Sequence, residues 1–307
     1  MHRVFRKLLL AGVASAALLS GASFAAEPVP VVASFSILGD LVRVVGGDRV
    51  SVTTLVGANE DAHAFTPRPA DARAIVNSRL LVINGLGFEP WAQKLAKSAG
   101  YQGETVVASK GVKPLLMAEE KGHEGKGHQH DEADPHAWQA PHNVVLYTRN
   151  IAAALSKVDP AGATAYQANV AAYVKELQAL DTWARAQFAA LPAAKRKVIT
   201  SHDAFGYFAA HYQIQFLAPQ GVSSDAEPGA RQVAQLIRQI QREKIRAVFI
   251  ENMRNPTLLT QLARDAGVTV APAVYVDALS AAGGPADSYL KLMRHNVTAL
   301  ALGMQKN

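Results

Sequence analysis

The feature that most constrains the fold of this 307-residue chain is one long stretch of helical periodicity, residues 160–191. Apolar side chains recur there every three or four positions, which is the spacing of one face of an α-helix. These positions are Tyr166, Val170, Tyr173, Leu177, Leu180, Trp183 or Ala184, and Phe188. A helix of roughly 30 residues is ~45 Å long, which is more than one small domain needs. The stretch therefore predicts a linking helix that joins two lobes.

On both sides of this stretch, short β-branched runs alternate with amphipathic segments. The predicted strands are residues 31–35, 50–56, 80–85, 105–109, 197–201, 214–219, 245–251 and 268–274. The predicted helices between them are residues 37–45, 69–77, 90–99, 228–243 and 256–266, and another helix starts at Pro141. Such alternation is typical of βα units and a mostly parallel sheet. We predict an α/β fold of two lobes, each a mostly parallel sheet flanked by helices. The predicted divisions are an N-terminal lobe at 26–159, the linking helix at 160–191 and a C-terminal lobe at 192–307.

The first 25 residues have the pattern of a secretory signal peptide. The basic residues Arg3, Arg6 and Lys7 precede an apolar run at 8–19, and small residues follow up to a cleavage site after Ala25. The apolar run is shorter than the ~20 residues of a membrane-spanning helix. The pattern predicts that residues 1–25 are cleaved and that the protein is exported.

The chain contains no cysteine. A disulfide framework, a thiolate metal site, a cysteine nucleophile and lipid attachment at a cysteine after the signal are therefore not expected. On this basis we predict a protein of the Gram-negative periplasm that is not a lipoprotein.

The net charge of +6 does not indicate a nucleic-acid partner. Without Arg3, Arg6 and Lys7, 28 basic residues stand against 25 acidic ones, a net charge of +3. The basic residues are scattered along the chain, whereas nucleic-acid binding requires a basic patch or stripe. We expect no nucleic-acid partner.

Three histidines and one aspartate follow predicted strands or a loop in a way that suggests a site. His63 and His202 come after strands, His136 follows a loop, and Asp277 lies just past the last predicted strand. Ligands of open α/β sheets bind outside the carboxyl ends of the strands. Three neutral imidazoles and one carboxylate form a nitrogen and oxygen set that suits Zn²⁺. The alternative is that each is a helix cap or a buried core polar group, because no compact metal motif links them.

A second group of histidines lies in a predicted loop at about 118–133. His123, His128 and His130 stand there among glycine, lysine and glutamate. Histidine-rich tracts can hold metal loosely, and glycine keeps such a tract mobile. A solvated polar loop that happens to carry histidine explains the same residues, so both interpretations stay open.

Several motifs resemble those of one known family. They are EDAHAF (60–65), NGLGFEPW (84–91), DPHAW (134–138), SHDAFGYFA (201–209), EPG (227–229), FIENMRNP (249–256) and VYVDALS (274–280). Together and in this order, they resemble the metal-specific solute-binding proteins of ATP-binding-cassette (ABC) importers, the ZnuA/TroA-like family of cluster A-I.

The resemblance implies a metal ion between the lobes, held at the positions of His63, His136, His202 and Asp277. Members similar to zinc binders carry histidine at the third of these positions, whereas typical manganese binders carry a carboxylate there. His202 therefore places this chain with the zinc branch, as the preference of imidazole for Zn²⁺ over Mn²⁺ also suggests. The resemblance further implies that Glu60 stands at most behind the ligands, and a histidine-rich loop before the second ligand is typical of the zinc members. We predict that His123, His128 and His130 in this loop relay metal to the site.

The function implied is capture of Zn²⁺ and its delivery to an ABC permease of the inner membrane, not enzymatic catalysis. We expect a monomer, and a periplasmic metallochaperone is a further candidate partner. The alternatives are a manganese-binding counterpart, a metal-binding adhesin, and a zinc-dependent hydrolase with Glu60 or Asp61 as general base. A fourth protein ligand argues against the hydrolase, because catalytic zinc keeps one position open.

Overall fold

The computed structural model describes residues 27–116, 133–219, 221 and 229–307. The predicted signal peptide and the three loop histidines His123, His128 and His130 lie outside the described residues. Among the helices of the described part, none is both long enough and apolar enough to span a membrane.

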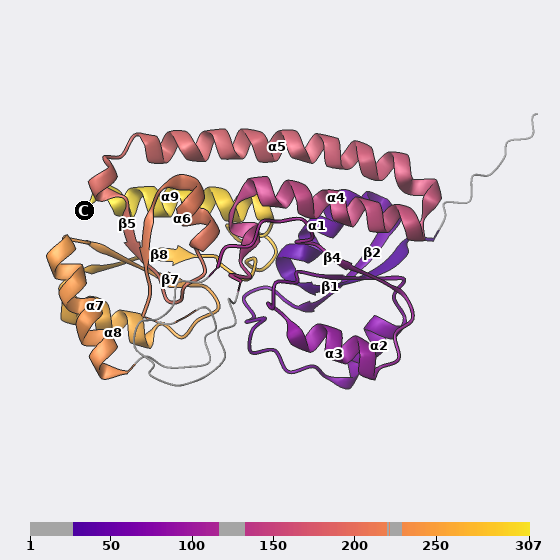
Figure 1. The fold of residues 1–307 in the computed structure, drawn as a ribbon, viewed down its shortest axis with the longest axis horizontal. Coiled ribbons are helices and arrows are strands. Elements are labelled where there is room, and N and C mark those ends of the chain that lie inside the picture. The colour runs from indigo at the N-terminus through magenta and orange to yellow at the C-terminus, as the bar shows by residue number, and fades with distance from the viewer. Residues whose placement is uncertain (1–26, 117–132, 220, 222–228) are drawn as a thin grey trace, which may run out of the picture.

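The N-terminal lobe is built on a four-stranded parallel sheet with the order β2-β1-β3-β4. Its elements are β1 (Val29–Phe35), α1 (Ser36–Gly46), β2 (Val50–Val56), α2 (Pro69–Val76), β3 (Leu80–Ile83), α3 (Pro90–Ser98), β4 (Glu104–Val107) and α4 (Pro141–Val158). Three of these helices begin with proline, whose fixed φ suits a first helical turn and whose missing N–H is not needed there. Helices α2 and α3 lie on one side of the sheet and α1 and α4 on the other (Figure 1).

The C-terminal lobe repeats this plan with the strand order β6-β5-β7-β8, again all parallel. Its elements are β5 (Lys197–Ile199), α6 (Gly206–Tyr212), β6 (Gln215–Leu217), α7 (Ala230–Glu243), β7 (Ala247–Glu251), α8 (Thr257–Ala266), β8 (Thr269–Val274) and α9 (Tyr289–Gln305). The predicted fold class, two α/β lobes with mostly parallel sheets, is confirmed.

Helix α5 (Ala163–Ala189) is the longest helix of the described chain and runs along both lobes (Figure 1). The side chains that it buries are Tyr166, Val170, Tyr173, Leu177, Leu180, Ala184 and Phe188. They pack against α1 and α4 of the first lobe and α9 of the second. Ala184 rather than Trp183 takes the buried position, while the indole of Trp183 lies under the Arg294 guanidinium. The division of the chain at 159/160 and 191/192 stays a prediction.

The largest hydrophobic cluster is continuous across the two lobes. It contains Leu41 and Val82 from the first lobe, Leu180 from α5, and Phe249 and Leu300 from the second. Smaller clusters lie where α2 and α3 cover the first sheet and where α7 and α8 cover the second. The lobes are therefore joined by packed apolar side chains beside α5.

Candidate metal centre

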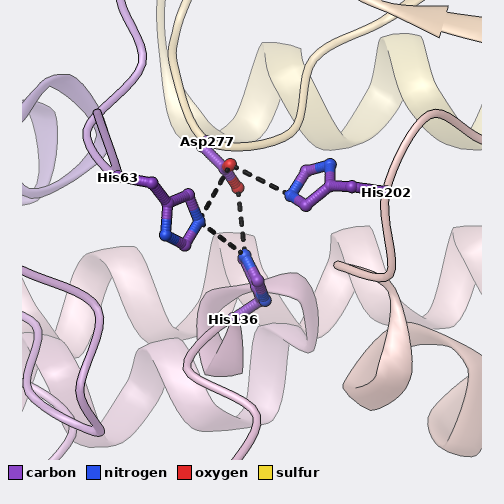
Figure 2. Close-up of side chains that lie close together, drawn as sticks. All are labelled: His63, His136, His202 and Asp277. Atoms are coloured by element: carbon purple, nitrogen blue, oxygen red, sulfur yellow. Dashed lines mark hydrogen bonds and ion pairs between the residues drawn. The ribbon is translucent and has the colours of Figure 1, made fainter. Parts of the chain in front are cut away.

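Four side chains converge where the two lobes face each other. His63 lies in the loop after β2, and His136 immediately precedes the 3₁₀ turn η2 (Ala137–Gln139). His202 follows β5 and Asp277 follows β8. Figure 2 shows the three imidazoles and the carboxylate pointing toward one another. Because all strands of each sheet are parallel, their carboxyl ends share one edge, and the two edges bring these residues together.

The inward-facing atom of each imidazole is Nε2. His63 Nε2 lies 3.3 Å from His136 Nε2 and 3.5 Å from Asp277 Oδ2. Asp277 Oδ1 is 3.5 Å from His136 Nε2, and Asp277 Oδ2 is 3.2 Å from His202 Nε2. One ligand atom from each residue lies within 4.8 Å of all the others. The side chain of His63 is 7% exposed and the other three are fully buried.

These separations fit a four-coordinate ion. Zinc bonds of ~2.0–2.2 Å in a tetrahedron place neighbouring ligand atoms ~3.3–3.6 Å apart. Within the described chain, His202 Nε2 and both oxygens of Asp277 are buried and make no hydrogen bond of regular geometry, although Asp277 Oδ2 and His202 Nε2 face each other at 3.2 Å. Buried polar atoms are normally satisfied, and a shared cation would satisfy all three. The donor set therefore suits a divalent metal ion.

His136 is oriented by the residue two positions before it. Asp134 Oδ1 accepts a hydrogen bond from the His136 backbone N–H, at 2.9 Å, and lies 2.8 Å from His136 Nδ1. The Asn84 side chain donates a hydrogen bond to the carbonyl of Pro135 at 2.9 Å, which fixes the peptide bond between Pro135 and His136. With Nδ1–H directed at a carboxylate, the lone pair of Nε2 faces the centre of the cluster.

His202 has an equivalent partner in Glu251, the last residue of β7. Glu251 Oε2 lies 2.6 Å from His202 Nδ1, and Oε1 accepts from the backbone N–H groups of Ser201 and His202 at 2.9 and 3.0 Å. All three bonds stay within the second lobe. Glu251 therefore holds His202 as Asp134 holds His136, with Nε2 turned inward.

The charges of the cluster are strongly coupled. Burial acts to lower the pKa of His202, but the carboxylates of Glu251 and Asp277 outweigh it and raise that pKa to about 10. Burial acts to raise the pKa of Asp277, but the charges of His202 and His136 hold it well below its usual value. The metal-free site therefore contains a protonated His202 beside an ionised Asp277 at neutral pH.

A buried cation from the second lobe stands beside the cluster. Arg254 Nη1 donates to Asp61 Oδ2 at 3.0 Å, and its Nη2 lies 3.9 Å from Asp277 Oδ2. Asp61 Oδ1 in turn accepts from the backbone N–H of His63 at 2.8 Å. Arg254 therefore connects a carboxylate of the site to the first-lobe loop that carries His63.

The structure does not place Glu60 behind the ligands. Its side chain is exposed, and its Oε2 accepts a hydrogen bond from the backbone N–H of Gly57 at 2.7 Å. The prediction for Glu60 is wrong because the carboxylate closes its own loop instead of reaching a histidine. The groups that do contact the four converging side chains from behind are Asp134, Glu251 and Arg254. Asp134, Glu251 and Arg254 all stand in motifs singled out in the sequence, DPHAW and FIENMRNP, but the motifs alone do not say which side chains those residues contact.

Comparison with known proteins identifies the family. The family described as "Zinc-uptake complex component A periplasmic" matches residues 31–303. The chain is 32% identical to the manganese-binding lipoprotein MntA of Halalkalibacterium halodurans, over 94% of this chain and 92% of that protein. It is 27% identical to the manganese ABC transporter substrate-binding lipoprotein PsaA of Streptococcus pneumoniae, over 97% of this chain and 96% of that protein.

Solved structures agree with this assignment. The periplasmic zinc-binding protein TroA of Treponema pallidum has a TM-score of 0.83 and 25% identity, covering 91% of this chain and 99% of that one. The Mn-bound periplasmic metal-binding protein of Candidatus Liberibacter asiaticus has a TM-score of 0.78 and 28% identity, covering 91% of this chain and 100% of that one.

The names of the relatives correct the predicted location. MntA, PsaA and further streptococcal relatives are named lipoproteins, which contradicts the prediction of a protein that is not a lipoprotein. That prediction used the absence of cysteine, which concerns only attachment at a cysteine side chain and does not establish that a protein diffuses freely. The predicted export of the protein fits these relatives, and only the claim that it is not a lipoprotein is overturned.

The matched proteins also identify the general class of activity. PsaA and further streptococcal relatives are named as substrate-binding lipoproteins of ABC transporters, so the prediction that the chain is not an enzyme is confirmed. Their shared cargo is a metal ion, and the cluster of three histidines and one aspartate described above fits such a cargo. The chain belongs to the ZnuA/TroA family of periplasmic metal-binding proteins, the substrate-binding components of ABC transporters.

Proposed function

We propose that this protein captures Zn²⁺ with His63, His136, His202 and Asp277 and delivers it to the permease of an ABC importer. The observation that carries the proposal is the convergence of one nitrogen or oxygen atom from each residue within 4.8 Å of the others, with neighbouring atoms as close as 3.2–3.5 Å. That spacing matches the edge of a tetrahedral zinc site. The ion is cargo, so the site has to hold it tightly and also open to release it.

The ligand chemistry favours zinc over manganese. Imidazole nitrogen suits Zn²⁺, whereas Mn²⁺ prefers carboxylate, carbonyl and water oxygen, and Zn²⁺ also binds a given site more tightly than Mn²⁺. Three of the four proposed ligands are imidazoles. Manganese is the second candidate, because MntA and PsaA are named for that metal.

Several partners and segments remain predictions. A permease with its ATPase follows from membership of an importer, and the monomeric state and the metallochaperone are expectations from the sequence. The relay by His123, His128 and His130 concerns residues outside the described part of the chain. The relatives named above are called metal-binding or transporter proteins, not hydrolases or adhesins.

Growth under metal limitation tests the function in cells. A strain that lacks this protein should grow poorly when zinc is chelated, and added zinc should restore growth while added manganese does not. A plasmid copy of the wild type should restore growth at low zinc, and a copy with Asp277→Asn should not. Asp181→Asn is the matched control, because Asp181 also pairs with a histidine, His211 at 2.6 Å, but lies outside the cluster. Rescue by manganese alone would contradict the zinc assignment.

A further inference from the structure

The segment that carries Asp277 follows a strand of the second lobe but is hydrogen-bonded to the first. The carbonyl of Val276 accepts from Trp138 Nε1 at 3.0 Å and from Gln139 Nε2 at 3.1 Å. Both donors are fully buried and belong to η2, the turn that directly follows His136. The peptide on one side of Asp277 is therefore fixed to the element that presents His136.

The backbone on the other side of Asp277 is held in the same way. The Leu279 N–H donates to Ser36 Oγ at 2.9 Å, and the Leu279 carbonyl accepts from the Asn59 N–H at 3.0 Å. Ser36 is the first residue of α1, and Asn59 lies in the loop that carries His63. The chain on both sides of Asp277 is thus hydrogen-bonded to the first lobe, and the bond to the second lobe beside Asp277, from Asn252 Nδ2 to the Ala278 carbonyl, is longer at 3.4 Å.

The hydrogen-bond partners of this segment change from the second lobe to the first at one peptide bond. The Tyr275 N–H and carbonyl both bond to the side chain of Asn296 on α9, at 2.9 and 2.5 Å. The Val274 carbonyl accepts from the Asn252 N–H within the second lobe. Tyr275 therefore belongs to the second lobe and Val276 to the first, which makes the Tyr275–Val276 peptide the boundary between them.

His202 is held differently. Its ring Nδ1 and its backbone N–H both bond to Glu251, inside the second lobe. Two polar bonds join this part of the second lobe to the first: the bond between Arg254 and Asp61 is partly buried, and the bond between Asn252 and Asn59 is exposed. Water can replace such bonds as the lobes separate, whereas pulling Val276 away from Trp138 and Gln139 would leave two donors without a partner while they are still buried.

We propose that Trp138 and Gln139 are positioning residues that keep Asp277 with the two first-lobe histidines when the lobes separate. Opening then removes His202 first and leaves the ion on three ligands, so release begins at His202. This inference rests on the proposed function. His202 then moves with the second lobe, whereas His63, His136 and Asp277 stay together on the first.

Distances between spin labels test which half Asp277 follows. The chain has no cysteine, so label pairs can be introduced without removing any residue. Lys94 on α3, Gln241 on α7 and Ala282 in the loop after Asp277 are exposed. In protein with Lys94→Cys and Gln241→Cys, removing zinc with a chelator should shift or broaden the distance distribution. In protein with Lys94→Cys and Ala282→Cys, the distribution should stay the same. A shift in both pairs, or in neither, overturns the inference.

A variant of Gln139 tests the positioning role. Gln139→Leu removes one donor to Val276, and zinc release into excess chelator should become about tenfold faster, as expected for one lost buried hydrogen bond. Asn143→Leu is the matched control, because it removes a buried bond to Ala137 in the same turn without touching Val276. Equal acceleration in both variants would indicate general loosening of the turn and contradict the inference.

Failure of the inference differs from failure of the function. If the unmodified protein binds no tight equivalent of zinc, both are overturned. If it binds zinc tightly but the 94–282 distance shifts on zinc removal, the inference alone is overturned.

Discussion

Asp277→Asn protein should bind zinc about a thousandfold more weakly than the wild type. The substitution keeps the shape of the side chain and removes the charge of a fully buried carboxylate whose oxygens face three imidazoles. Two unit charges 4 Å apart attract by about 4 kcal/mol at an effective dielectric constant of about 20, and each 1.4 kcal/mol is about tenfold in affinity. A dication doubles this attraction, while easier deprotonation of His202 offsets part of the loss. The measurement is competition with a chelator of known affinity.

The matched substitution Asp181→Asn should leave zinc affinity unchanged. Asp181 lies on α5 and pairs with His211 and Arg185, so the variant removes a half-buried carboxylate from a histidine without touching the cluster. Comparable losses in the two variants would mean that zinc affinity depends on overall charge or stability. Unchanged affinity in Asp277→Asn protein would exclude Asp277 as a ligand.

Zinc affinity should fall about tenfold for each pH unit between pH 8 and pH 6. The pKa of His202 in the metal-free site is raised to about 10, so this imidazole carries a proton throughout the interval. Zinc requires the neutral imidazole and must displace that proton, and a lower pH makes the displacement harder. Asp277 stays ionised because its pKa is held well below its usual value. Calorimetry in buffers of different ionisation enthalpy should find at least one proton released per zinc at pH 7.5.

The variant Glu251→Gln tests whether the proton released on zinc binding comes from His202. The Glu251 carboxylate is one of the two charges that raise the pKa of His202 above the level that burial would give. Without that charge the pKa of His202 falls, and the dependence of affinity on pH should flatten at the alkaline end of the interval. An affinity in the wild type that does not change between pH 8 and pH 6 would contradict the proposed role of His202.

Most elements of the fold could be predicted from local patterns. The helices α2, α3 and α4 begin at the prolines that predicted them, and α5 buries the predicted apolar stripe. The sequence does not predict α9, because its buried face includes Asn296 and Gly303, which interrupt the apolar stripe. Predicted strand 197–201 is too long, since β5 ends at Ile199 and the next residues turn toward Glu251.

The four converging residues could be anticipated because each follows a strand or stands in a motif of the family. The groups that orient them depend on contacts across the fold. Glu251 reaches His202 because β5 and β7 are neighbours, with Ile199 paired to Val248. Arg254 and Asp61 are 193 residues apart in the chain and meet only when the lobes face each other. No local pattern encodes such a contact.

The most direct test of the central claim is a competition titration of metal-free protein, residues 26–307, with Zn²⁺ and Mn²⁺. We expect one tight equivalent of zinc, displaced by the chelator only at high concentration, and manganese binding at least ~100-fold weaker, as a site of three imidazoles and one carboxylate requires. Manganese binding as tight as zinc, or the absence of any tight equivalent, would contradict zinc capture by His63, His136, His202 and Asp277.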